Sequence, residues 1–286
     1  MLSEIKKNRG IVFRVLLFIF AIIGLIFVLV FIAMQFGWLN VKGSVSERNS
    51  YFNINESFNL DTINTNEVVP SWKDTSEWKL LKEVFTRDQV IIKKAASDAG
   101  ISPRLILGGV IGEQLRFFSN RRESFKNYFE PMKILAQLSK FSFGIAGLKP
   151  ETVALVESHL KDSNSTFYLG KGMENVADYE PGVNQDTERM NRITDVKNPY
   201  YSYLYVGLFM REVEVEWANA GYDISNRPEV ITTLYNLGFN RSIPKADARA
   251  GGAVISVGGK DYTFGDLGYE FYYSDELADI FPVEVK

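Results

Sequence analysis

The chain has 286 residues, of which 46% are hydrophobic and 23% charged, a balance typical of a packed protein rather than a disordered one. It contains no cysteine and a single histidine, His159, which excludes disulfides, thiolate metal centres, cysteine nucleophiles and multi-histidine metal sites. The net charge of −3 argues against a general nucleic-acid-binding protein. The length allows one large domain or two small ones.

An apolar segment near the N-terminus predicts a membrane anchor. Residues 15–34 carry no charged side chain, and a helix of that length spans about 30 Å, the hydrocarbon thickness of a bilayer. Four basic side chains lie within residues 1–14, so the positive-inside rule keeps this N-terminus in the cytoplasm and predicts export of the rest. We therefore expect a transmembrane helix over residues 15–36, with a cleaved signal peptide as the alternative.

The exported part is expected to consist of a tether and one domain. Residues 37–75 are rich in Asn, Ser, Thr and Glu and show poor periodicity, which favours a solvated tether. Residues 76–286 show helical periods, which predict a mainly α-helical domain. Its expected helices are one from residue 76, then 87–99, 103–118, 126–140, 149–161, 200–220 and 228–237.

Three features interrupt this helical pattern. The polar residues 162–198 predict a long irregular insertion, which at that length is often a functional loop or lid. Gly258-Gly259 lies between the short segments 253–257 and 260–264, which predicts a small C-terminal β-hairpin. An aromatic run at the C-terminus could stack on sugar faces or pack a small satellite core. Its members are Tyr262, Phe264, Tyr269, Phe271, Tyr272 and Tyr273.

The first motif with chemical content is a single carboxylate, Glu113, late in an otherwise apolar helix. A carboxyl group in apolar surroundings resists ionisation, and the protonated form is what a general acid needs near neutral pH. Gly108, Gly109 and Gly112 each weaken the helix by roughly 1 kcal/mol relative to alanine, so close approach of another helix or of a ligand is expected there. The alternative is a solvated glutamate at the edge of a core helix.

Two further motifs follow in the chain. Residues 142–152 give a glycine turn, a short extended run and a proline that opens a helix. Tyr235 and Asn236 lie at the C-terminal end of a helix capped by Gly238, and both side chains can bind sugar hydroxyl or acetamide groups. Each motif taken alone is also consistent with an ordinary loop or helix end.

Taken in order, these motifs resemble the lytic transglycosylases and their goose-type lysozyme relatives. That family places a catalytic Glu in a helix of the form I-x-x-E-S, followed by S-x-G-L-M-Q-L-M-P-x-T-A and later by A-Y-N-A-G. The resemblance covers residues 86–240 and implies a lysozyme-like helical domain. It implies that Glu113 is the catalytic acid and that the glycan contacts are Gln114, Ser142, Gly144, Ile145, Ala146, Tyr235 and Asn236.

Two positions depart from the family pattern. Gln114 stands where the family usually has Ser, and Gly147 stands where it has a Gln that contacts the sugar. These departures leave two interpretations of the protein open. It is either a divergent member of the family with a reshaped groove, or a module that has lost catalysis and binds or scaffolds the cell wall.

The resemblance implies cleavage of the β-1,4 bond between N-acetylmuramic acid and N-acetylglucosamine in peptidoglycan, without a cofactor or metal. We expect a protein of the bacterial cytoplasmic membrane, with the catalytic domain on the periplasmic side. Its expected partners are glycan strands, the membrane through its N-terminal helix, and other envelope proteins, but not nucleic acid. A lysozyme-type hydrolase would need a second carboxylate to position water. The candidates for it are Glu123, Glu130, Asp178 and Glu180.

Overall fold

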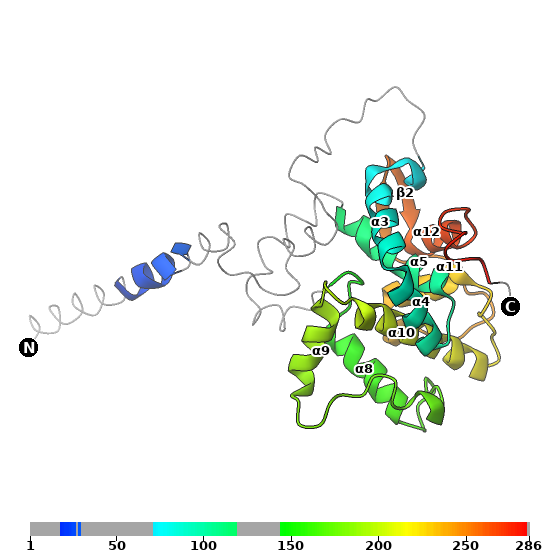
Figure 1. Cartoon of the computed structure of the whole chain (residues 1–286), viewed down its shortest axis with the longest axis horizontal. Helices are drawn as coiled ribbons and strands as arrows, with labels where there is room; N and C mark the ends of the chain where they lie inside the picture. Colours follow the sequence, from blue (N-terminus) through cyan, green and yellow to red (C-terminus); the bar gives the residue numbers. More distant parts are fainter. Residues whose placement is uncertain (1–17, 27, 30–70, 119–143, 285–286) are drawn as a thin grey trace, which may run out of the picture. The chain divides into compact units, whose positions relative to one another are not determined.

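The computed structural model describes residues 18–26, 28–29, 71–118 and 144–284 (Figure 1). The chain divides into a smaller unit, Met1–Val41, and a larger one, Lys42–Lys286. The described residues are mainly helical with one two-stranded antiparallel sheet, which confirms the expected fold class at that level. The predicted helix 126–140 and the tether up to residue 70 lie outside the described residues.

Within the smaller unit, residues 18–26 and 28–29 are helical, and their large apolar side chains are exposed. No helix among the residues described is both long and apolar enough to cross a membrane. The other residues of the expected anchor, 15–36, lie outside the described ranges, so the anchor stays a prediction.

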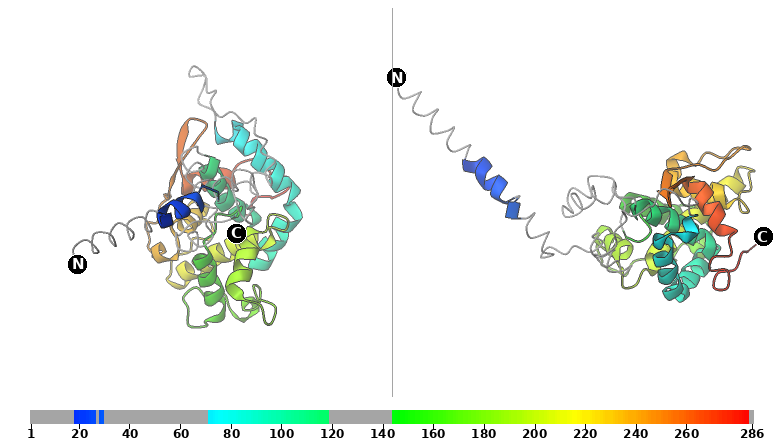
Figure 2. Two further views of the ribbon diagram at one scale, coloured as in Figure 1. Left: turned by 90° about the vertical axis from the view of Figure 1, so that its left-hand side faces the viewer. Right: turned by 90° about the horizontal axis from the view of Figure 1, so that it is seen from above.

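The larger unit is built from eight α-helices among its described residues, together with the hairpin and three short 3-10 helices (Figure 1). The hairpin and α3 lie at one end of this unit, α8 and α9 lie at the other, and α5 and α10 lie between (Figures 1 and 2). The helices are α3 (Ser76–Arg87), α4 (Gln89–Ala99), α5 (Pro103–Phe118), α8 (Pro150–Lys161), α9 (Gln185–Thr194), α10 (Tyr200–Asn219), α11 (Pro228–Leu237) and α12 (Phe264–Tyr272). The short 3-10 helices are η1 (Trp72–Asp74), η2 (Lys171–Met173) and η3 (Phe239–Arg241), and the strands are β1 (Val254–Val257) and β2 (Lys260–Thr263).

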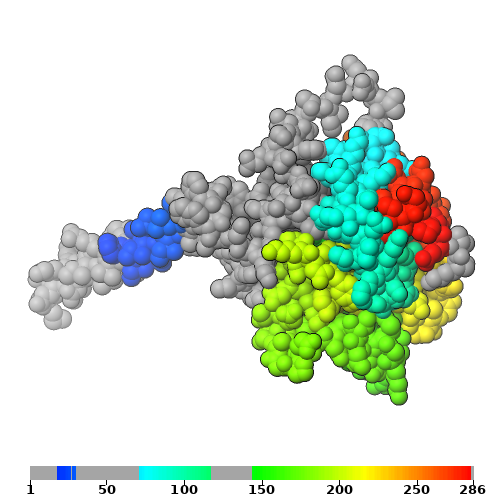
Figure 3. All heavy atoms as spheres, in the orientation of Figure 1, coloured from blue at the N-terminus to red at the C-terminus, as the bar shows by residue number. Residues whose placement is uncertain are grey.

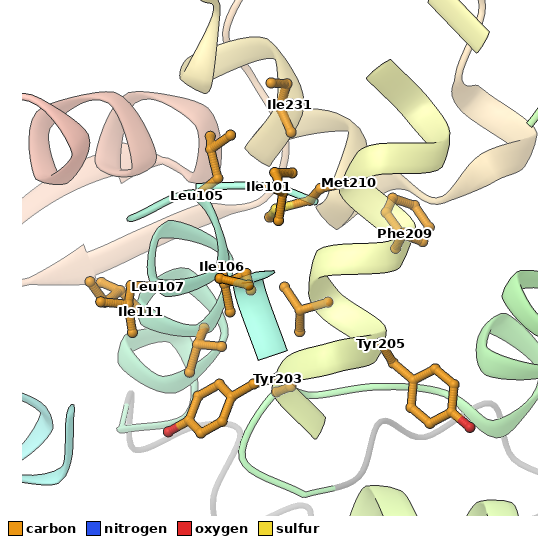
Figure 4. Packing of buried hydrophobic residues seen from close by; sticks show 14 of the residues in the cluster. Ile101, Leu105, Ile106, Leu107, Ile111, Tyr203, Tyr205, Phe209, Met210 and Ile231 are labelled. Carbon is orange, nitrogen blue, oxygen red and sulfur yellow. The ribbon is translucent and has the colours of Figure 1, made fainter. Parts of the chain in front are cut away.

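The core forms where α5, α10 and α11 meet. Apolar side chains from the three helices gather there, among them Leu105 of α5, Met210 of α10 and Ile231 of α11 (Figure 4). All three are at most 3% exposed. Helix α10 is buried on nearly all sides, which is why its sequence is apolar around the whole circumference over its first eleven residues.

The N-terminal part of the domain begins earlier than expected. Trp72 is fully buried, its ring packs edge-on against Trp78 at 5.0 Å, and its indole nitrogen donates to Glu270. Residues 71–75, which we expected in the tether, therefore pack with the domain. In α4, Val90 is 75% exposed, while Ile92 and Ala95 are buried.

The C-terminal region contains the predicted hairpin and a helix that we did not predict. Val257 pairs with Lys260 across the two-residue turn Gly258-Gly259, and both glycines have the positive φ that such a turn requires. Helix α12 follows directly, so most of the aromatic run packs into the main core rather than into a satellite. Tyr262, Phe264, Phe271 and Tyr272 are buried, whereas Tyr269 and Tyr273 are about half exposed.

A fully buried arginine fastens this C-terminal region to α5. Arg104 donates hydrogen bonds to backbone carbonyls at the end of α12 and beyond, including those of Tyr272 at 2.8 Å and Phe281 at 2.8 Å. Its positive charge therefore meets the negative end of the helix dipole. In the space-filling view the C-terminal segment lies directly beside α3, the first α-helix of the larger unit (Figure 3).

The insertion 162–198 is more regular than expected, because it contains η2 and α9. Asn184 caps α9 by accepting a hydrogen bond from the Thr187 amide at 2.9 Å. The segment is fastened to α8 by Arg189, whose guanidinium donates to Glu157 at 2.7 and 2.9 Å. The end of α9 lies against the loop that precedes α8, because the Ile193 carbonyl is next to Gly144.

Candidate functional site

The three sequence motifs, which are separated by up to 123 residues, meet around Glu113 in the structure. Glu113 lies in the last turns of α5 and is 4% exposed. The second motif forms the loop before α8, and Tyr235 and Asn236 lie at the C-terminal end of α11.

The three glycines of α5 permit close packing around the helix that carries Glu113. A β-carbon at Gly109 would lie 2.6 Å from the Met210 side chain and 3.2 Å from the Tyr235 ring. One at Gly112 would lie 2.5 Å from the Phe264 ring, and one at Gly108 would lie 3.3 Å from Thr232. The expected close approach is therefore made by α10, α11, α12 and their side chains, which brings Tyr235 next to the glutamate's helix.

Gly147 lies directly against the carboxylate of Glu113. A β-carbon at residue 147 would lie 2.6 Å from Glu113 Oε2 and 2.9 Å from its Cγ. Gly147 also has φ +63°, in the left-handed region that favours glycine. The glycine that departs from the family pattern is thus the residue that leaves room for Glu113 in this position.

Arg116, one turn further along α5, forms an ion pair with Glu113. Its Nη2 atom lies 2.6 Å from Oε2 and 2.9 Å from Oε1, and the Arg116 side chain is 17% exposed. We expected apolar surroundings for Glu113 from the sequence. The structure differs, because the positive charge of Arg116 balances the carboxylate. Asn236 Nδ2 also faces Oε1, at 3.5 Å.

The loop of the second motif is held by the other two motifs through its backbone. Gln114, the neighbour of Glu113, donates to the carbonyl of Ile145, and the Tyr235 hydroxyl donates to the carbonyl of Ala146 at 2.7 Å. Burial raises the pKa of the Tyr235 hydroxyl well above its ordinary value, so this group stays protonated and remains a donor. These two hydrogen bonds fix the loop against the carboxylate.

Asn236 is itself oriented by the segment that leads into the hairpin. The Ala253 amide donates to Asn236 Oδ1 at 2.8 Å, which leaves the Nδ2 donors of Asn236 directed toward Glu113. A β-carbon at Gly252 would lie 3.0 Å from the same oxygen. The orientation of the Asn236 side-chain amide is therefore set by the Ala253 backbone on one side and by the Glu113 carboxylate on the other.

The remaining predicted site residues contribute in different ways. Ser142 lies outside the described residues. Gly144 has φ +67°, and a β-carbon there would lie 1.9 Å from the carbonyl oxygen of Ile193 at the end of α9, so only glycine fits. The side chains of Ile145 and Ala146 are buried, so their contribution to the site is through the backbone rather than through exposed groove surface.

The two described candidates for a second carboxylate lie away from Glu113. Asp178 and Glu180 line a separate pocket of about 320 Å³ beside α8, and Asp178 pairs with Lys161 at 2.5 Å. Glu123 and Glu130 lie outside the described residues. Within the described ranges, no group of three or more acidic or histidine side chains is arranged to hold a metal ion.

A second buried carboxylate, Glu212 of α10, was missed by the sequence reading. It is fully buried, and its Oε2 lies 2.8 Å from Nδ1 of His159 on α8, which is half-buried. Burial raises the pKa of Glu212 well above its ordinary value and lowers the pKa of His159. The signal that was available is the spacing of Tyr205, Leu208 and Glu212 along one buried face of α10.

Comparison with known proteins adds no relative. No family model, no curated protein and no solved structure matches the chain.

Proposed function

We propose that the protein is a peptidoglycan lytic transglycosylase, in which Glu113 cleaves the bond between N-acetylmuramic acid and N-acetylglucosamine. The observation that carries the proposal is the meeting of all three motifs at one carboxylate. Glu113 touches Gly147 of the second motif and Asn236 of the third, while Tyr235 is bonded to the loop between them. A lysozyme-like domain is the fold that this arrangement implies.

The proposed reaction uses one carboxyl group twice. Protonated Glu113 gives its proton to the bridging oxygen as the bond from that oxygen to C1 of the muramic residue breaks, and positive charge develops at C1. The carboxylate then takes the proton of the muramic C6 hydroxyl as its oxygen bonds to C1. The products are a 1,6-anhydro end and a free N-acetylglucosamine hydroxyl, Glu113 is protonated again, and no water is consumed.

The one-carboxylate route needs no second acid, whereas an inverting hydrolase would need one about 6.5–9.5 Å from Glu113. The carboxylate's contacts among the described residues are a guanidinium, an amide and a glycine, and the described candidates Asp178 and Glu180 line a separate pocket. Asn236 is placed to orient the carboxyl or the acetamide group of the sugar. The Tyr235 hydroxyl donates to the Ala146 carbonyl, so it positions the loop before α8 and acts on the site through that loop.

Arg116 sets a condition on the first step. In the first step a carboxyl oxygen must face the bridging oxygen, whereas Oε2 accepts a hydrogen bond from Arg116 Nη2 at 2.6 Å. The proposal therefore requires Arg116 to leave Oε2 when a glycan strand binds.

The same ion pair favours a second candidate function, a non-catalytic module that binds glycan strands. In that case the Arg116 pair with Glu113 would persist in the bound state and serve only to fix the end of α5. The anchor and tether predicted from the sequence would then hold a wall-binding domain at the membrane.

The two functions separate in one experiment with the full-length protein. Purified sacculi are incubated with the wild type and with Glu113→Gln, and the soluble products are identified by mass. The transglycosylase predicts 1,6-anhydro-muropeptides from the wild type and none from the variant. Reducing ends would instead indicate a hydrolase, and binding to sacculi without soluble product would indicate the non-catalytic module.

A further inference from the structure

A pocket of about 350 Å³ lies on the opposite face of α11 from Tyr235 and Asn236. Its floor is apolar and includes Trp217, Leu234 and Leu237. Its remaining wall is residues 241–249, a segment that follows η3. The charged side chains that line it are three cations and one carboxylate, namely Arg241, Lys245, Arg249 and Asp247.

The three cations are exposed, and none of them has an ion-pair partner among the residues the structure describes. The one carboxylate in the lining, Asp247, leaves a surplus of two positive charges there. Residues 1–14 carry a net charge of +3, which leaves −6 for the rest of the chain. The pocket is therefore a local positive site on an acidic domain.

The pocket is adjacent to the candidate site. Residues 230, 233, 234 and 237 follow the spacing of one helix face, while Tyr235 and Asn236 lie on the face toward α5. A helix with its side chains is about 10–12 Å across, so the two sites are separated by roughly one helix diameter. The wall segment also continues to Ala253, whose amide orients Asn236.

We propose that this pocket binds the peptide stem of the same peptidoglycan strand, through the carboxylates of that short acidic peptide; this inference rests on the proposed function. The unpaired cations complement free carboxylates. The apolar floor at Leu234 and Leu237 suits the alanine methyl groups that the stem places between its carboxylates. A glycan strand at Glu113 would place its peptides within reach, because the pocket shares α11 with that site.

The test measures binding without cleavage. The full-length protein is titrated calorimetrically with a purified N-acetylglucosaminyl-N-acetylmuramyl-tetrapeptide and with the same disaccharide lacking the peptide. Neither ligand contains the bond that the proposed reaction breaks. The proposal predicts that the peptide improves affinity about tenfold, by charge contacts that weaken as salt rises.

The variant that removes the pocket's positive charge combines Arg241→Gln, Lys245→Gln and Arg249→Gln. Its matched control combines Lys79→Gln, Lys171→Gln and Lys197→Gln, three exposed lysines outside the pocket. The proposal predicts that the first triple variant binds both ligands equally and that the control keeps the tenfold difference. Equal binding of both ligands by the wild type, or an unchanged difference in the pocket variant, would overturn it.

Further results distinguish peptide binding at this pocket from lipid binding and from the catalytic proposal. If phosphatidylglycerol vesicles bind the wild type but not the pocket variant, while both bind the muropeptide alike, the pocket serves lipid and the inference is wrong. If sacculi are cleaved but the peptide adds no affinity, the inference alone fails. If the peptide adds affinity but sacculi yield no new sugar ends, the catalytic proposal fails and the binding site stands.

Discussion

Glu113 and Glu212, two of the three buried glutamates among the described residues, differ in their surroundings. Glu212 is fully buried between α10 and α8, touches His159 through one oxygen, and leaves its other oxygen without a partner among the described residues. Glu113 is almost as buried, but Arg116 contacts both of its oxygens and Asn236 faces one of them. Burial alone would rank Glu212 as the stronger candidate for an acid.

The difference lies in what surrounds each carboxyl group. Glu212 lies in the contact between α10 and α8 and faces His159, whose ring stacks on Phe167 at 4.6 Å and meets Phe239 edge-on at 4.8 Å. Glu113 lies where the other two motifs meet, directly against Gly147, whose lack of a side chain leaves room for the carboxylate. A buried carboxyl is therefore a useful functional signal only when neighbouring elements also present groups that could hold a substrate.

The largest expected effect separates the two glutamates directly. Glu113→Gln should lower the release of muropeptides from sacculi by at least about 100-fold, because a general acid commonly contributes that much. Glu212→Gln should leave the rate within about twofold, since that side chain is sealed in the core. Muropeptide release per unit time checks both. Comparable losses in the two variants would contradict the distinction.

A smaller effect is expected from covering the carboxylate. Gly147→Ala should lower the rate by about 10- to 100-fold, because the added carbon displaces Glu113. The matched control is Gly100→Ala, whose φ of +69° matches the +63° of Gly147 but whose surroundings are open. Both should lose about 1 kcal/mol of stability from backbone strain. Equal rates in the two variants would show that the contact at Gly147 has no catalytic consequence.

The ion pair can be tested through the rate of muropeptide release. Arg116→Gln removes the guanidinium that donates to both oxygens of Glu113, so the carboxyl no longer has to be released when a strand binds and the rate should rise severalfold. Arg211→Gln is the control, because Arg211 pairs with Glu214 at the same three-residue spacing on α10. An unchanged rate for Arg116→Gln would show that the pair does not affect the reacting carboxyl.

The smallest effect concerns stability and the Glu212–His159 contact. Because burial raises the pKa of Glu212, its contribution to stability is present below the ordinary value of 4.5 and is lost as pH rises through the raised value. Glu212→Gln should therefore stabilise the domain more at about pH 8 than at about pH 5, by about 1 kcal/mol. Urea unfolding at the two pH values measures the difference.

His159 Nδ1 lies 2.8 Å from Glu212 Oε2, so the comparison reports on the pair of groups. Burial lowers the pKa of His159, which would by itself make stability rise with pH toward the ordinary value of 6.5. A gain for Glu212→Gln that is the same at both pH values would mean that Glu212 does not titrate differently in the folded and unfolded chains.

The helices whose apolar residues recur at three- and four-residue steps were predictable from the sequence. Helices α3, α10 and α11 follow the expected ranges closely, because burial on the core imposes that spacing. Helices α9 and α12 were missed, since α9 is polar and α12 lies within an aromatic run. Their caps, Asn184 and Thr263, were the available signals.

The candidate site was predictable only in part. The order of the motifs placed Glu113, Tyr235 and Asn236 in one site, and the structure brings them together. The direction of the Arg116 side chain was not predictable, because a residue one turn away on a helix can point to solvent as easily as to its neighbour. Glu212 was missed because alternation with valine in residues 212–216 favours a solvated face.

The most direct test of the central claim is to digest sacculi in water enriched in oxygen-18 and to weigh the new sugar ends. The claim is that Glu113 acts alone and that the substrate's own hydroxyl closes on C1. It predicts anhydro ends that contain no heavy oxygen and that disappear in Glu113→Gln. Ends that carry one heavy oxygen, or no new ends at all from the wild type, would contradict it.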